Sequence, residues 1–345
     1  MGMNNPPPKL NQRVRWSTVI GIAVVVLGIV IFVWGEAIQL AWSQRAVAPF
    51  SAAKMPLQSE RAYAYLKEVC AIGPRISGTP GMLKQQELLK NHFEKLGAKV
   101  SLQEFDARHP ETGQRVRLAN QIVQWHPEKR DRILLCCHYD TRPYPDREPD
   151  PRKVRDPFIG ANDGGSGVAM LMELGNHMAG LRSKYGVDFV FFDGEELVYD
   201  DNLRRDPYFL GSEYFARDYV TNPPAHKYRW GVLVDMIGDK QLTIYREVNS
   251  MAWTDTRPLV LELWKTAAAL GVKEFVNVTR HEIRDDHLAL RNVAKIPTCD
   301  IIDFEYPNAR GPNYWHTTQD VPENCSGESI CKVGYVIFEW LKLTK

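Results

Sequence analysis

The main pattern along the chain is a series of short apolar runs separated by segments with helical spacing. Four runs have the length and composition of buried strands, at residues 133–137, 187–192, 231–234 and 296–302. Helical spacing of apolar residues is found at 59–70, 80–96, 165–179, 211–219, 257–270 and 326–343. Two earlier segments, 99–105 and 116–124, alternate like paired strands. The pattern predicts an α/β fold with a mixed, mostly parallel central sheet and helices on both faces.

A longer apolar run precedes this domain. No charged residue occurs from Trp16 to Gly35, and about 20 apolar residues are enough to cross a bilayer as a helix. Lys9, Arg13 and Arg15 precede the run, and by the positive-inside rule they place the first residues in the cytoplasm and the rest of the chain outside it. We therefore predict a cytoplasmic N-terminus 1–15, a transmembrane signal anchor 16–36 that contacts the lipid bilayer, a linker 37–58 and a catalytic domain 59–345. Secretion after signal cleavage near Ala46–Ala48 is the alternative, although that site lies well beyond the apolar run.

The composition of the chain is that of a globular protein and shows no sign of nucleic-acid binding. The chain has 345 residues, 44% of them hydrophobic and 25% charged, with a formal net charge of +1. These values are typical of a globular protein, and the lack of a basic stripe gives no reason to expect nucleic acid as a partner. The six cysteines form no CxxC pair, which argues against a cysteine-based zinc knuckle. The sequence leaves open whether Cys325 and Cys331 form a disulfide.

Polar side chains follow the predicted buried strands, at the edge where open α/β sheets bind ligands. The metal-ligand candidates are His138 and Asp235, each just beyond a strand, Asp163 at the start of a helix, one of the neighbours Glu195 and Glu196, and His316 across a further loop. One such residue alone is more often structural, as a helix cap or a satisfied histidine. Five at one edge predict a zinc site, because imidazole and carboxylate groups are zinc ligands and a cation offsets carboxylates that otherwise repel. Neighbouring residues at a strand end point in different directions, so one of Glu195 and Glu196 can bind the metal while the other acts as a base.

Six motifs in fixed order resemble those of the zinc-dependent aminopeptidase clan, which shares its exopeptidase fold with the animal-type and bacterial glutaminyl cyclases. They are HYD at 138–140, GANDGGSG at 160–167, FFDGEE at 191–196, LVDMIG at 233–238, DDH at 285–287 and WHT at 315–317. The resemblance extends from Ser59 to the C-terminus. It implies that the metal ligands are His138, Asp163, Glu196, Asp235 and His316, that Glu195 is the general acid/base, and that Asp140 orients His138.

The two branches of this fold differ in their chemistry. A glutaminyl cyclase uses one Zn²⁺ and converts the N-terminal Gln of a peptide or protein to pyroglutamate with release of ammonia, whereas an aminopeptidase uses two and hydrolyses the first peptide bond. Asp285 favours the cyclase, since the resemblance implies an aspartate that shares a proton with Glu195 or Asp235. Trp315 also favours it as a residue of the substrate pocket, with a packing aromatic as the alternative.

Two positions depart from the animal cyclases, which carry a tryptophan near Asp201 and a histidine near Asp300. A receptor-like protein that has lost its metal is the non-enzymatic alternative. The complete ligand set argues against it.

Overall fold

The computed structural model describes residues 49–199 and 207–344. Within them, six strands form the main sheet in the order β1–β2–β4–β3–β5–β8. The strands are β1 Lys99–Arg108, β2 Arg115–Trp125, β3 Asp131–His138, β4 Gly186–Phe192, β5 Lys227–Asp235 and β8 Thr298–Ile302. Strands β4, β3, β5 and β8 are parallel, whereas β2 pairs antiparallel with both β1 and β4. The predicted mixed, mostly parallel sheet is confirmed.

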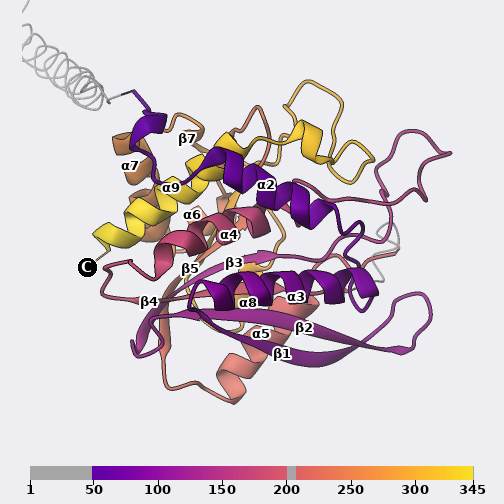
Figure 1. The fold of residues 1–345 in the computed structure, drawn as a ribbon, viewed down its shortest axis with the longest axis horizontal. Helices are drawn as coiled ribbons and strands as arrows, with labels where there is room; N and C mark the ends of the chain where they lie inside the picture. The colour runs from indigo at the N-terminus through magenta and orange to yellow at the C-terminus, as the bar shows by residue number, and fades with distance from the viewer. Residues whose placement is uncertain (1–48, 200–206, 345) are drawn as a thin grey trace, which may run out of the picture. The chain divides into compact units, whose positions relative to one another are not determined.

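Alternate residues of the central strands face two different helical layers. Ile133 and Leu135 belong to a large core with helices α2, α3, α4, α7 and α9, whereas Leu134 and Cys136 belong to a smaller core with α5 and α8. Figure 1 shows α2, α4 and α9 on one side of the sheet and α5 on the other. The helices are α2 Ser59–Cys70, α3 Pro80–Lys95, α4 Ser166–Met178, α5 Leu210–Thr221, α7 Arg257–Leu270, α8 His287–Asn292 and α9 Gly327–Leu343. Both faces are covered, as predicted, so the central strands carry continuous apolar runs.

The short elements of the fold were not predicted. They are η1 Ala52–Lys54, β6 Ile244–Arg246, α6 Val248–Ala252, β7 Phe275–Thr279 and η2 Pro322–Asn324. Strands β6 and β7 pair in parallel as a separate small sheet. Each of these elements has too few residues to show a period of its own. Met55 and Leu57, which lie in the predicted linker, pack into the large core.

Several expectations concern residues 1–48 and 200–206, which lie outside the described residues. They are the cytoplasmic segment, the membrane anchor, most of the linker and the departure at Asp201. In the part of the chain that is described, no helix is both long and apolar enough to cross a membrane. All six cysteines lie in that part, and Cys325 and Cys331 are buried free thiols rather than a disulfide.

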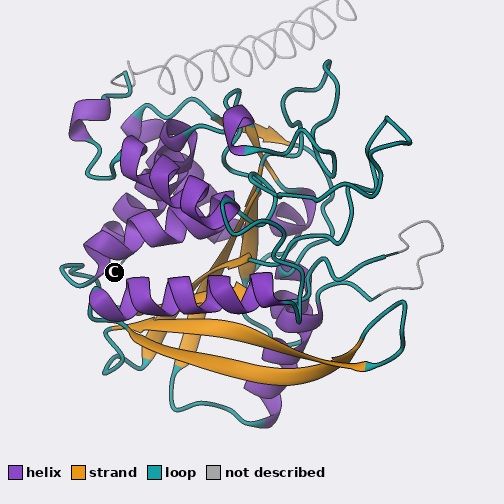
Figure 2. Cartoon of the chain, turned by 45° about the vertical axis from the view of Figure 1, so that its right-hand side comes forward, coloured by secondary structure: helices purple, strands orange, loops and turns teal. Residues whose placement is uncertain are grey.

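The parallel strands end together at one edge of the sheet. His138, the last residue of β3, pairs with Phe192, the last residue of β4, and Asp235 ends the neighbouring strand β5. Many of the loops gather at the right-hand side of the molecule in Figure 2. At the opposite end of β3, Arg132 and Asp188 form a buried pair, with Nε 3.0 Å from Oδ2 and Nη2 2.5 Å from Oδ1. The structure thus places a purely internal ion pair at one end and the predicted site at the other.

Candidate metal centre and active site

Asp163 lies between the two predicted histidine ligands. Its Oδ1 is 3.1 Å from Nε2 of His138, and its Oδ2 is 3.4 Å from Nε2 of His316. Asp235 Oδ1 lies 3.2 Å from Nε2 of His138, and Glu196 Oε1 lies 2.9 Å from Nε2 of His316. The structure therefore brings all five predicted ligands together, as two groups of three that share Asp163.

The chemistry of this cluster fits a zinc ion. Ligand atoms of His138, Asp163 and Glu196 all lie within 4.8 Å of one another, and the three residues are buried. Among the described residues, Oδ2 of Asp163 and Oε2 of Glu196 are buried and have no hydrogen-bond partner. Buried carboxylate oxygens without partners are costly, and a divalent cation bound there would satisfy them. Imidazole and carboxylate donors are the set that zinc takes in catalytic sites.

The carboxylates make the electrostatic potential of the cluster negative. Burial and the Arg142 guanidinium oppose protonation of His316, yet Glu196, Asp146 and Asp163 raise the pKa of His316 to about 10. The carboxylates around His316 therefore attract positive charge. A bound metal ion would replace the proton of His316.

Arg142 is a cation in this cluster that the sequence reasoning missed. Its buried Nε lies 3.3 Å from Oε1 of Glu196, 3.3 Å from Nε2 of His316 and 3.4 Å from Oδ1 of Asp146. The available signal was its position two residues after the HYD motif, on the loop that leaves β3 at the carboxylate-rich edge. Its guanidinium offsets part of the negative charge next to the metal ligands.

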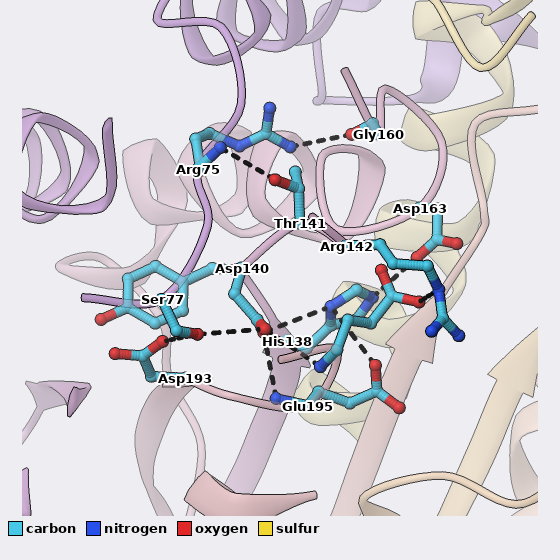
Figure 3. Close-up of polar contacts among 12 residues, drawn as sticks. Arg75, Ser77, His138, Asp140, Thr141, Arg142, Gly160, Asp163, Asp193 and Glu195 are labelled. Atoms are coloured by element: carbon cyan, nitrogen blue, oxygen red, sulfur yellow. Dashed lines mark hydrogen bonds and ion pairs between the residues drawn. The ribbon is translucent and has the colours of Figure 1, made fainter. Parts of the chain in front are cut away.

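The turn after β4 separates the predicted base from the predicted ligand. Gly194 has φ +73, and a Cβ there would meet Leu118 at 2.5 Å, so the turn requires glycine. Asp140 then holds both glutamates by their backbone, because Oδ1 accepts the Glu195 N–H at 3.1 Å and Oδ2 accepts the Glu196 N–H at 3.0 Å. The distance from Asp140 Oδ1 to Nδ1 of His138, which Asp140 was expected to orient, is 3.7 Å and is too long for a hydrogen bond. Figure 3 shows Asp140 between His138 and Glu195.

The loop that carries Asp163 is held from two sides, by residues that the sequence reasoning also missed. Asp320 accepts the N–H of Asn162 at 2.7 Å and that of Asp163 at 3.1 Å. On the other side, the buried Arg75 guanidinium donates to the carbonyl oxygen of Ile159 at 2.6 Å. It also donates to that of Gly160 at 2.8 Å (Figure 3). These bonds fix the backbone from which Asp163 reaches both histidines.

A cavity of about 420 Å³ opens beside the cluster. Its walls include Glu195 and Asp285, together with Trp315, whose ring centroid lies 4.0 Å from that of His316. Burial and the charges of Glu196 and Asp285 raise the pKa of Glu195 well above its usual range, against the opposing effect of His138. Oδ1 of Asp285 accepts the N–H of Asp286 at 2.6 Å. Burial and the charge of Asp235 raise the pKa of Asp285 well above its usual range. The proton shared with Glu195 or Asp235 stays a prediction.

A mixed sheet covered on both faces, with a buried cluster of histidine and carboxylate groups beyond its parallel strands, defines the class of the metal-dependent exopeptidases. The model of peptidase family M28 matches residues 120–341. The chain belongs to this family.

The chain is similar to glutaminyl cyclases and to a Zn-dependent exopeptidase. A crystal structure of Fimbriiglobus ruber glutaminyl cyclase is 42% identical, with a TM-score of 0.79, and the match covers 84% of this chain and 96% of that one. The glutaminyl-peptide cyclotransferase of Drosophila melanogaster is 26% identical over 72% of this chain and 70% of its own length. A Zn-dependent exopeptidase from Parabacteroides distasonis is 33% identical, with a TM-score of 0.74, and the match covers 86% of this chain and 99% of that one.

Proposed function

We propose that this protein is a zinc-dependent glutaminyl-peptide cyclotransferase that acts on the N-terminal Gln of peptides or proteins. The observation that carries the proposal is the position of Glu195. Its buried carboxyl group lines the cavity, 3.9 Å from Nδ1 of His138, while its neighbour Glu196 faces the other histidine. The similarity to the Fimbriiglobus ruber glutaminyl cyclase supports the same conclusion.

The reaction needs one proton to move between two nitrogen atoms of the substrate. The α-amine attacks the side-chain amide carbon, a ring C–N bond forms, and the bond to the amide nitrogen breaks to release ammonia. Glu195 accepts the proton that the amine loses and donates it to the leaving nitrogen. Burial and neighbouring carboxylates raise the pKa of Glu195, so it holds a proton more readily than an exposed glutamate would.

The five clustered side chains would hold the zinc, with one ion expected for a cyclase. When bound, zinc supplies a Lewis acid that polarises the side-chain amide carbonyl of the substrate. Trp315 on the cavity wall would pack against the substrate's glutamine side chain and exclude water from it. Asp285 contributes to the raised pKa of Glu195, and burial and the charge of Asp235 raise the pKa of Asp285 itself well above its usual range.

Aminopeptidase activity is the second candidate, and the geometry around Asp163 favours it. The two oxygens of Asp163 face two different histidines, so Asp163 would be able to help hold two ions, which would supply the chemistry for activating a water molecule. In that case Glu195 would deprotonate a water molecule that attacks the first peptide bond.

Product analysis separates these two reactions. A Gln-initiated and a Leu-initiated peptide are incubated with the zinc-loaded protein, and ammonia and free amino acid are measured in both. Ammonia from the Gln peptide without free leucine from the other supports the cyclase. Free leucine without ammonia identifies an aminopeptidase, and neither product under any metal loading would contradict both.

We also propose that residues 16–36 anchor the catalytic domain to a membrane, with residues 1–15 in the cytoplasm. The support is the uncharged run from Trp16 to Gly35 and the basic residues before it. Fractionation of cells that express the full chain should find it in the membrane pellet after a high-salt wash. Recovery in the soluble extracellular fraction with a shortened N-terminus would instead support the cleaved signal.

A further inference from the structure

Strand β1 is an edge strand that projects beyond the catalytic edge of the sheet. Among the described strands only β2 pairs with it, so its outer side has no strand partner (Figure 1). Strand β2 pairs with β4 only from Gln121 onward, and Gln121 lies opposite Phe191. The last residues of β1, 105–108, pair with the part of β2 before that point and therefore extend past the end of β4. The hairpin is joined to the turn after β4, since the Ala119 N–H donates to Oδ2 of Asp193 at 2.9 Å.

A second cavity, of about 720 Å³, lies along this projecting part of β1. Its walls include the four consecutive residues Phe105, Asp106, Ala107 and Arg108, and none of its described wall residues belongs to β2. Side chains of consecutive strand residues point to opposite faces of a sheet, so a cavity that all four border includes the edge of the strand. Because β2 occupies the inner edge of β1, the cavity lies at the outer edge, where unpaired N–H and C=O groups can bind a further strand.

The opposite wall of the second cavity is the first half of α5. Tyr214 of this helix has an exposed fraction of 38% and stacks on Phe105, with ring centroids 4.7 Å apart and an interplanar angle of 12°. The acidic wall residues Asp106 and Glu213 are each paired with an arginine, so their charges are already compensated. An aromatic surface beside a strand edge suits an extended peptide, which is held by its backbone whatever its sequence.

The second cavity meets the catalytic cavity at Tyr208, which lines both of them. The next residue, Phe209, lines the catalytic cavity, and its N–H donates to the carbonyl oxygen of Glu195 at 3.3 Å. Leu210 lines the second cavity, and its N–H donates to the carbonyl oxygen of Gly194 at 3.0 Å. One short segment, bonded to the backbone of the proposed base, thus separates the two cavities. A polypeptide whose first residue lies at Glu195 can continue across this segment to β1.

We propose that the second cavity binds the substrate polypeptide beyond its first residues, as an extended strand against the free edge of β1. The inference rests on the proposed function and names the substrate class, which is peptides or proteins with an extended N-terminal segment rather than dipeptides. Pairing through the main chain accepts many sequences, while the stacked rings of Phe105 and Tyr214 contact one side chain of the bound segment.

Substrates of two lengths test the proposal. Ammonia release from a Gln-initiated octapeptide should have a kcat/KM about tenfold above that of the dipeptide Gln-Ala, a difference of ~1.4 kcal/mol. N-methylation of the octapeptide's backbone amides from its third residue onward should abolish this advantage, because it removes the donors that pair with a strand edge. Tyr214→Ala should lower the octapeptide-to-dipeptide ratio of kcat/KM by about two- to tenfold. Leu261→Ala, which truncates an exposed side chain on α7, is the matched control and should leave that ratio unchanged.

Fluorescence anisotropy of a labelled octapeptide measures binding to the zinc-loaded Glu195→Gln variant without turnover. Tighter binding of the octapeptide than of its N-methylated form supports the proposal. Equal kcat/KM for the two lengths, equal binding of the two octapeptides, or an unchanged ratio in Tyr214→Ala would each overturn it. A dimer that dissociates in Tyr214→Ala, as measured by sedimentation, would also overturn it, since a second copy would then occupy the edge of β1. If the wild type releases no ammonia, the proposed function fails instead, while the anisotropy still decides whether the cavity binds a peptide.

Discussion

Glu247 offers a quantitative test of the electrostatics around the site. It caps α6 and accepts backbone N–H groups from Asn249 at 2.8 Å, Ser250 at 2.6 Å and Ile283 at 3.2 Å. The bond from the Ile283 N–H holds the segment that leads to Asp285 on the cavity wall. Burial opposes ionisation of Glu247, but His287 and the amides of α6 lower its pKa from 4.5 to about 2.

This lowered pKa corresponds to a contribution to folding. A shift from 4.5 to about 2 is worth ~3 kcal/mol at ~1.4 kcal/mol per pKa unit. Because the folded-state pKa is the lower one, the contribution is present above about pH 4.5 and is lost as the pH falls toward 2. Glu247→Gln removes the charge, so the variant should be about 3 kcal/mol less stable at pH 7, and this difference should shrink below pH 4.5.

Thermal unfolding from pH 7 to pH 3 measures this difference. For a domain of this size, about 3 kcal/mol lowers Tm by roughly 6–12 °C. Glu213→Gln is the control, since Glu213 forms an exposed ion pair with Arg217 that is worth less than about 1 kcal/mol. A Tm difference for Glu247→Gln that stays constant down to pH 3 would refute the reasoning, because lost packing rather than lost charge would then be the cause. An unchanged Tm at pH 7 would refute it as well.

Three further substitutions probe the base, the sheet and the cavity. Glu195→Gln should lower the rate of ammonia release by about 10²–10⁴-fold and leave the zinc content unchanged, as measured by metal analysis; comparable activity would exclude Glu195 as the proton carrier. Arg132→Met leaves the Asp188 carboxylate buried without its cation, and calorimetry should show a loss of about 3–5 kcal/mol; a loss below 1 kcal/mol would contradict this. Trp315→Ala should raise KM by about two- to tenfold with little effect on kcat, and an unchanged KM would indicate a packing role instead.

Much of the fold was predictable because its signal is local. The runs 133–137 and 187–192 are apolar throughout since both faces of their strands are covered, and such runs stand out in any sequence. The meeting of His138, Glu196 and Asp235 could be predicted from topology, because parallel strands end at one edge, whereas Asp163 and His316 lie on loops and were assigned as ligands from the family resemblance. The sheet formed by β6 and β7 was missed since strands of three and five residues carry too short a pattern.

The supporting residues of the site could not be predicted, because their partners lie far away in sequence. Ser77 meets Asp193 across 116 residues, and Asp320 meets Asn162 across 158. No periodicity or motif reports a hydrogen bond between two such loops. The hydrogen bonds that Asp140 accepts could not be predicted either, because its distance from the Glu195 and Glu196 amides depends on the left-handed turn at Gly194.

Asp320 has a consequence for how the metal centre can be handled experimentally. It lies four residues after His316 on the same segment, and its carboxylate accepts two backbone N–H groups of the loop that carries Asp163. Both ligand-bearing loops are therefore braced by bonds that use none of the ligand atoms. The conformational entropy of ordering these loops is lost when the chain folds, not when an ion arrives. Chelation should leave the fold in place, and Co²⁺ added afterwards should enter a ready-made centre whose visible spectrum reports its geometry.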